Sequence, residues 1–407
     1  MVTLLKSDEP DQSQYPAPGM DHSPLGRKRG IAVRLYEGDL YWGQTVAKPL
    51  RFDKLAAASH TRVLIAGGGP SVFLPKAGET KIPEGLRELA EVARKETYEI
   101  CRPLIVGDAN AIRDALRITA LDLEINSISA VKDARFQFGT LDVYDLKNVD
   151  MAKLQYGKVS AMSGHAAFEA IEKVIELARK KEIDATVTGP INKESINLAG
   201  HHYSGHTEIY AHFTHTQDFT MMLAHENLRV VHVSTHVSLK EACERVKKDR
   251  VLKVIKLAYE ACRKIGIADP RIGVAGLNPH AGESGMFGRE EIEEIIPAIE
   301  EAKALKINAD GPIPPDSLFS KAKGGLYDIV VAMYHDQGHI PLKVVGFNWN
   351  EEKQKWDSIS GVNITLGLPI IRSSVDHGTA FGKAGKGTAS ELSLVHAIEY
   401  AVKMTRE

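Results

Sequence analysis

Short apolar segments alternate with amphipathic helical segments along most of this 407-residue chain. The clearest apolar segments are residues 230–235, 272–277 and 328–334, and helical periodicity marks the stretches 240–265 and 290–304 between them. Such alternation predicts parallel strands that are joined by crossover helices. We therefore expect a fold of the α/β class.

Each of the three apolar segments leads into a histidine, namely His236, His280 or His335. In an open parallel sheet, ligands bind in the crevice beyond the carboxyl ends of the strands. Three imidazoles at that edge would suit a divalent metal, most simply zinc with one open coordination position. The alternative is that these histidines are hydrogen-bonded polar residues of a crevice.

Composition excludes several classes of partner. The net charge of −2 gives no electrostatic reason to expect nucleic acid or an anionic membrane as a partner, so any anion must be bound by a local cluster. No stretch approaches about 18 apolar residues, so we expect no membrane span. Cys101, Cys243 and Cys262 are widely spaced, which favours reduced thiols and a cytoplasmic location. Residues 1–8 are too short and too acidic for a signal peptide.

Two clusters suggest an anion site. His206 and Thr207 follow a glycine in the sequence SGHTE, and both side chains can donate hydrogen bonds to an oxyanion. An ordinary helix start with Ser204 as its N-cap is the alternative. Lys343 and Arg372 would bind a phosphate or carboxylate if the fold brought them to one pocket. The alternative is that they are solvated surface charges, which is less easily accepted for Arg372 because it follows an apolar run.

Candidates for proton transfer are fewer. Lys193, in the segment TGPINK, would act as a general acid or base if burial lowered its pKa, although an exposed lysine at a helix start is the simpler interpretation. Asp336 directly follows His335 and is placed to supply charge or to hydrogen-bond the imidazole.

Other segments are interpreted as structural. Residues 6–29 have the composition of a mobile tail, and the glycine-rich turn 67–70 is followed by Pro75, which favours an ordinary loop over a phosphate-binding one. Residues 347–360 are polar and predict a surface loop or hairpin. Ser163 is expected to cap a helix whose apolar stripe runs from Ala167 to Ala178.

Seven motifs together resemble the 4-hydroxythreonine-4-phosphate dehydrogenase family, PdxA. In chain order they are TGPINK (188–193), GHTE (205–208), STH (234–236), LNPHAGE (277–283), YHDQG (334–338), VNITLGLP (362–369) and SVDHGTA (374–380). The resemblance runs from about Tyr98 to Met404. Segments 98–103 and 155–161 are more similar to the branch associated with D-threonate or D-erythronate 4-phosphate. Residues 1–97 and the insertion between Lys343 and Asn363 depart from the family pattern.

The resemblance implies a fold and an assembly. It implies two α/β/α domains around a cleft, as in isocitrate and isopropylmalate dehydrogenases, and a homodimer with its sites near the interface. We expect a tail over residues 1–29, a first domain over 30–160 plus 361–407, and a second domain over 161–360.

The resemblance also implies an activity, which is metal-dependent, NAD- or NADP-linked oxidation and decarboxylation of a phosphorylated hydroxy acid. The metal, which is Zn, Mg or Co, would be held by His236, His280 and His335, partly across the dimer. The substrate would be held by the residues that match the family's binding positions, which are His206, Thr207, Lys343, Asn363 and Arg372. Lys193 or Asp336 is expected to transfer the proton. The competing readings are a zinc hydrolase and a non-catalytic phosphate-ester binder that lacks the usual amino-terminal cofactor loop.

Overall fold

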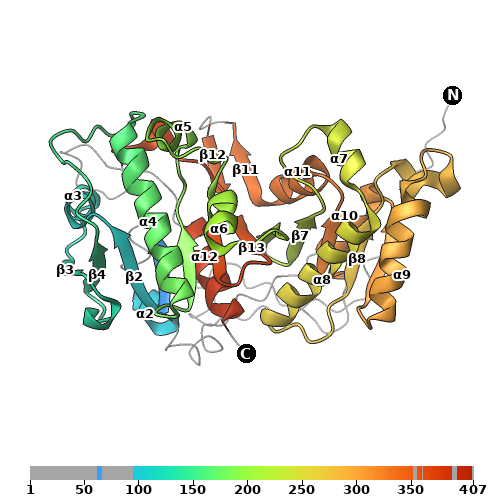
Figure 1. The fold of residues 1–407 in the computed structure, drawn as a ribbon, viewed down its shortest axis with the longest axis horizontal. Coiled ribbons are helices and arrows are strands. Elements are labelled where there is room, and N and C mark those ends of the chain that lie inside the picture. Colours follow the sequence, from blue (N-terminus) through green and yellow to red (C-terminus); the bar gives the residue numbers. More distant parts are fainter. Residues whose placement is uncertain (1–61, 67–94, 352–354, 360, 387–391, 406–407) are drawn as a thin grey trace, which may run out of the picture. The chain divides into compact units, whose positions relative to one another are not determined.

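The computed structural model describes residues 62–66, 95–351, 355–359, 361–386 and 392–405 (Figure 1). The strands are β1 Arg62–Ala66, β2 Arg102–Gly107, β3 Glu124–Ile128, β4 Thr140–Asp145, β5 Ala185–Thr188, β6 Thr220–His225, β7 Leu228–His232, β8 Ile272–Ala275, β9 Ala309–Ile313, β10 Ile329–Ala332, β11 Phe347–Asn350, β12 Lys355–Ile359, β13 Val362–Leu366 and β14 Ile371–Val375. The α-helices are α2 Lys95–Ile100, α3 Ala109–Thr119, α4 Ala161–Arg179, α5 Lys193–Leu198, α6 His206–Thr214, α7 Leu239–Arg245, α8 Lys248–Lys264, α9 Ile296–Ala304, α10 Pro315–Lys323, α11 His335–Gly346 and α12 Leu392–Met404. Four short helical turns are η4 Val131–Asp133, η5 Pro279–Gly285, η6 Glu291–Ile295 and η7 Phe381–Lys383.

Among the described residues, twelve strands form one sheet in the order β3-β4-β2-β1-β5-β14-β13-β6-β7-β10-β8-β9. Strands β7, β10, β8 and β9 are parallel neighbours, as the alternation of segments predicts. The α/β class is thereby confirmed. The division into two discontinuous domains stays a prediction.

The sheet is not parallel throughout, and the exceptions have a local cause. Strands β6 and β7 are antiparallel and are joined by only two residues, Glu226 and Asn227, with Glu226 at φ 51°. Strands β13 and β14 are also antiparallel and are joined by residues 367–370. Connections this short cannot hold a crossover helix, so each reverses the chain direction. As a result, β7, β10 and β8 run opposite to β5 and β14.

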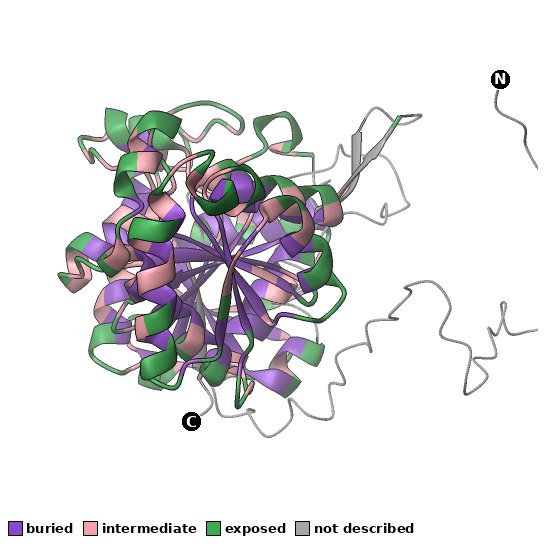
Figure 2. Cartoon of the chain, turned by 90° about the vertical axis from the view of Figure 1, so that its right-hand side faces the viewer, coloured by how far each residue is buried: buried purple, intermediate pink, exposed green. Residues whose placement is uncertain are grey.

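The core lies on both faces of the sheet. Along β10, Ile329 and Val331 pack against one face with α8, α9 and α12, whereas Val330 and Ala332 pack against the other with α10 and α11. This alternation follows from the period of two along a strand. Figure 2 shows the strands buried and the helices turning exposed residues outward. Burial of each such aliphatic side chain contributes about 1.5–3 kcal/mol before the cost of ordering it.

Several local predictions are corrected. Ser160, not Ser163, caps α4, because the Ser160 hydroxyl accepts a hydrogen bond from the Ser163 backbone N–H. The stripe expected on this helix is buried. The single helix expected over 240–265 is divided into α7 and α8. The segment 347–360 contains the antiparallel pair β11 and β12, which confirms the hairpin.

The described residues do not test every expectation. The predicted tail and the turn 67–70 lie outside them. The helices that the structure describes include none with the length and apolar character needed to cross a membrane.

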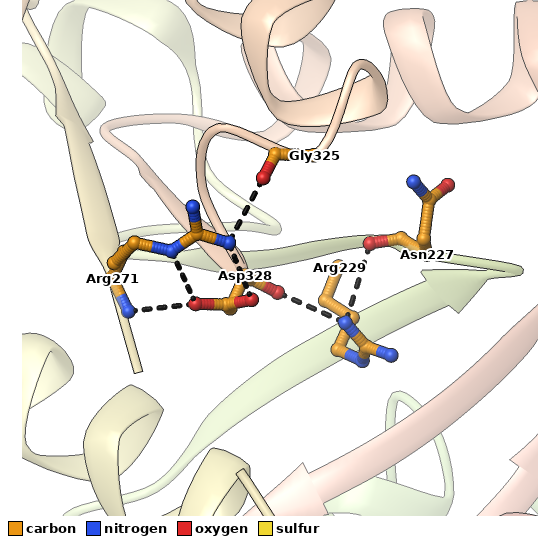
Figure 3. A network of polar contacts seen from close by, with 5 residues as sticks. All are labelled: Asn227, Arg229, Arg271, Gly325 and Asp328. Carbon is orange, nitrogen blue, oxygen red and sulfur yellow. Dashed lines mark hydrogen bonds and ion pairs between the residues drawn. The ribbon is translucent and has the colours of Figure 1, made fainter. Parts of the chain in front are cut away.

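At the amino ends of β8 and β10, a polar network joins the strands (Figure 3). The Asp328 carboxylate accepts hydrogen bonds from the Arg271 backbone N–H at 2.8 Å and from its guanidinium at 3.1 Å through both Nε and Nη2. Arg229 donates to the backbone oxygens of Asp328 and Asn227. Although burial alone would raise it, the pKa of Asp328 is lowered by the hydrogen bonds and charge of Arg271.

Candidate active site

Two of the three predicted metal-binding histidines meet. His335 is the first residue of α11, directly beyond β10, and His236 lies four residues beyond the end of the neighbouring β7. Their ring centroids are 5.8 Å apart. The expectation that histidines converge from neighbouring strand ends therefore holds for this pair.

One ring nitrogen of His335, Nδ1, already has a hydrogen-bond partner. Nδ1 of His335 lies 2.6 Å from Oδ1 of Asp336, and because a carboxylate only accepts, Nδ1 carries the proton. In the neutral imidazole, this contact leaves Nε2 of His335 as the nitrogen that can bind a metal. Asp336 thus contacts His335 as the sequence suggested.

His280 does not join this pair within one chain. It is exposed, and it lies in a turn where residues 280–284 all have positive φ, between 40° and 79°. The buried Glu291 carboxylate holds the start of this turn by accepting hydrogen bonds from the N–H groups of Leu277 at 2.8 Å and Asn278 at 2.7 Å. Among the residues that the structure describes, no three His, Cys, Asp or Glu side chains form a group that would hold a metal.

Arg372 is the most deeply buried of the predicted substrate residues. It is 2% exposed, and its Nη atoms donate to the hydroxyls of Thr365 at 2.8 Å and Thr188 at 3.0 Å. Its Nε has no hydrogen-bond partner within the described ranges. The guanidinium lies 5.5 Å above the Tyr210 ring, and burial lowers the pKa of Arg372 to about 10. Among the described residues, the groups that hydrogen-bond to Arg372 are therefore neutral, and the Glu208 carboxylate acts on it through its charge without forming an ion pair.

His206 and Thr207 stand beside this cation at the start of α6. The N-cap is Gly205, which offers no side-chain hydrogen bond, so the alternative of a helix start capped by Ser204 is wrong in its cap residue. The Nε2 atom of His206 is buried and has no partner in the part of the chain described. Burial, and then the charge of Arg372, hold the pKa of His206 well below its usual value. Uncapped N–H groups at a helix start attract anions.

A pocket of about 570 Å³ includes one member of each cluster. Its lining contains Thr207 and Glu208 of α6 together with His232 and His236. Burial lowers the pKa of His236; the charge of Glu208 opposes this shift, and those of His335 and Lys193 add to it. Lys193 itself is exposed at the first position of α5, near Gly205. Lys193 thus lies close enough to the pocket to act on His236.

Lys343 and Asn363 complete the set of predicted substrate residues. Lys343 is exposed on α11, two turns after His335, and lies 5.6 Å from the centre of the Phe347 ring. Asn363 Nδ2 lies 2.7 Å from the Met221 sulfur, while its Oδ1 is buried without a partner in the described residues. Both side chains keep hydrogen-bonding capacity that the described residues do not use.

Sequence reasoning missed three neighbours of this site. His339 lies next to His335, and the fully buried His232 lies next to His339; burial lowers the pKa of His339 to about 4 and that of His232 to about 3. The helical spacing of four residues from His335 was the signal for His339. Burial raises the pKa of Asp376 to about 6, against the charges of Lys343, His377 and His335.

Comparison with known proteins supplies the family. The family described as pyridoxal phosphate biosynthetic protein PdxA matches residues 99–401. A D-threonate 4-phosphate dehydrogenase of Cupriavidus necator is 46% identical over 305 residues, which cover 75% of this chain and 88% of that protein. A 4-hydroxythreonine-4-phosphate dehydrogenase crystal structure from Burkholderia phymatum has a TM-score of 0.70 and 39% identity, and covers 86% of this chain and 100% of its own.

A more distant relative shares the fold. The crystal structure of a terephthalate 1,2-cis-dihydrodioldehydrogenase from Burkholderia xenovorans has a TM-score of 0.57 and 28% identity, and covers 84% of this chain and 98% of its own. The family match and the first two relatives confirm the resemblance seen in the motifs, and this chain belongs to the PdxA family.

Proposed function

We propose that this chain is a dehydrogenase that uses NAD or NADP to oxidise and decarboxylate a phosphorylated hydroxy acid. D-threonate 4-phosphate is the first candidate substrate, D-erythronate 4-phosphate is close to it, and 4-hydroxythreonine 4-phosphate is the next. The names of the relatives support the reaction class. The buried Arg372, which forms no ion pair with any carboxylate of the described residues, is the observation in this chain that carries the proposal.

The phosphate end of the substrate would lie against Arg372 and the start of α6. Arg372 supplies a planar cation, and its Nε is available to donate. His206 and Thr207 add side-chain donors and the uncapped N–H groups of the helix. Lys343 and Asn363 are proposed to contact the same substrate. Fixing the phosphate positions the rest of the molecule near His236 and His335.

A divalent metal would be held by His236 and His335. The two imidazoles, with Asp336 on Nδ1 of His335, suit zinc or another divalent ion. The third ligand would be His280 of the partner subunit, since its exposed position in this chain leaves it available to another copy. Such an ion polarises oxygen atoms bound to it. We therefore propose a homodimer whose site is completed across the interface.

The proton from the substrate hydroxyl would pass to Lys193. Its position beside Gly205 and its influence on His236 support this assignment. Asp336 is the alternative, but its bond to Nδ1 of His335 suits it better to fixing that imidazole. Both assignments stay proposals. A reducing, cytoplasmic location is also proposed, since Cys101, Cys243 and Cys262 form no disulfide.

The test is a substrate panel. D-threonate, D-erythronate and 4-hydroxythreonine 4-phosphates are each incubated with NAD or NADP, and absorbance at 340 nm is followed before and after chelation. We expect reduced cofactor to form with the threonate ester, to stop on chelation, and to return with Zn²⁺, Co²⁺ or Mg²⁺. Phosphate release without reduced cofactor would instead indicate the zinc hydrolase. Binding of the ester by calorimetry, without any turnover, would indicate the non-catalytic binder.

A further inference from the structure

Four histidine rings lie in a row that begins at the proposed metal site and ends in the core. Beyond His236 and His335, the ring of His339 lies 3.6 Å from that of His335 at an interplanar angle of 11°. The fully buried His232 follows at 4.7 Å and 42°. The proposed function uses the first two rings and leaves the inner two without a role.

The ring of His339 is held from several directions. It is 7% exposed, and its Nδ1 donates a hydrogen bond to the His335 carbonyl oxygen at 2.9 Å. On its far side, His232 is wedged against Gly338, where an added Cβ would lie 2.3 Å from His232 Nε2. His339 therefore presents a fixed flat surface to His335.

The helix alone gives His335 little support. His335 is the first residue of α11, its N-cap residue Tyr334 makes no side-chain capping bond, and Pro341 inside the helix has no N–H to donate to the carbonyl of Gln337. Asp336 fixes the His335 ring at one edge through Nδ1. The His335 ring could still rotate about its hydrogen bond to Asp336, so a second restraint on the face of the ring is needed.

We propose that His339 is a positioning residue that fixes the plane of the His335 ring, so that Nε2 of His335 is directed to the ion it shares with His236. His232 supports His339 from the core. This inference rests on the proposed metal site and adds the residues that orient one of its ligands. Partners that orient a metal-binding histidine typically change metal affinity by about 10- to 100-fold when removed.

The test compares His339→Leu with His339→Phe in the full-length apoprotein. Leucine removes the ring stack and the hydrogen bond, whereas phenylalanine keeps a flat ring against His335. The readouts are Co²⁺ affinity by titration and the visible absorption spectrum of the bound Co²⁺. We expect His339→Leu to bind Co²⁺ at least about 10-fold more weakly with an altered spectrum, and His339→Phe to recover most of the affinity and the spectrum.

Two controls separate the possible failures. His165→Leu removes another stacked pair, that of His165 with His201 at 5.2 Å and 3°, and should leave Co²⁺ binding unchanged. His335→Ala should abolish binding; if it does not, the proposed metal site and this inference fall together. If His335→Ala abolishes binding but His339→Leu binds as the wild type does, only this inference is overturned. Equal losses in His339→Leu and His339→Phe would also overturn it, because the ring plane would then be irrelevant.

Discussion

Arg271 and Arg372 show opposite solutions to placing a guanidinium in the same sheet. The side chain of Arg271 is 47% exposed, yet it shares two hydrogen bonds with the Asp328 carboxylate (Figure 3). Arg372 is 2% exposed, yet within the described residues it hydrogen-bonds only to threonine hydroxyls and its Nε has no partner. A buried charge without a counter-charge costs far more than an exposed one.

The difference indicates what each arginine is for. Arg271 joins the amino ends of β8 and β10, where a carboxylate from the protein itself completes the pair. Arg372 lies beside His206, whose Nε2 is also buried without a partner in the described residues. Stability alone would not keep these groups unsatisfied. We infer that an anion from outside the chain completes this second region.

The largest expected effect comes from Arg372→Met. Losing the buried cation should raise the KM for the phosphorylated substrate by about 100-fold or more. The free energy of unfolding should stay within about 1 kcal/mol of the wild type or increase, because methionine needs no counter-charge. Steady-state kinetics and urea denaturation measure the two quantities. An unchanged KM would show that the anion binds elsewhere.

Asp328→Ala should show the reverse behaviour. It leaves Arg271 without its carboxylate and removes three hydrogen bonds at the strand ends, which should lower the free energy of unfolding by about 1–3 kcal/mol. The turnover of the folded fraction should not change, since the network lies away from the candidate site. A loss of kcat without a loss of stability would contradict the purely structural role assigned to Arg271 and Asp328.

Asp376→Asn tests a smaller effect, which is the cost of burying a carboxylate in the folded protein. The folded pKa of Asp376 is raised from 3.8 to about 6, mainly by burial, so the folded state binds more protons than the unfolded state between these values. Stability from this group is then present below about pH 4 and is lost as pH rises to 6. The asparagine variant should be more stable than the wild type at pH 7 by about 1–2 kcal/mol, after allowance for partial solvation.

Urea denaturation of both proteins at pH 4.5 and pH 7 measures this difference. The advantage of Asp376→Asn should be smaller at the lower pH, where the wild-type carboxyl is largely protonated in the folded state. An equal difference at both pH values would mean that the carboxyl is not destabilised by its surroundings.

Local patterns predicted much of this fold. The continuous apolar runs of strands such as β10, which is buried on both faces, and the stripe on α4 follow directly from the residue pattern. The antiparallel pairing of β6 and β7 was not predicted, because the two-residue connection at Glu226 and Asn227 was not recognised as a hairpin turn. The break between α7 and α8 was missed because helical periodicity continues across Val246.

For the candidate site, residue type and position after a strand indicated which residues take part. They did not predict how far apart these residues lie in the fold. His236 and His335 were predicted to meet because parallel neighbours end at one edge, and they do. His280 follows β8, the neighbour of β10, yet the left-handed turn 280–284 directs the chain in a way that no residue pattern specifies. His232 was read only as part of a strand, since nothing in sequence places it beneath His339.

The most direct test of the account is whether the substrate supplies the missing counter-charge. Urea denaturation is measured with and without D-threonate 4-phosphate for the wild type and Arg372→Met. A ligand at 100 times its Kd should stabilise the wild type by about 2.7 kcal/mol and should leave Arg372→Met nearly unchanged. Equal stabilisation of both proteins, or none of the wild type, would contradict the claim that Arg372 is left unpaired for the phosphate.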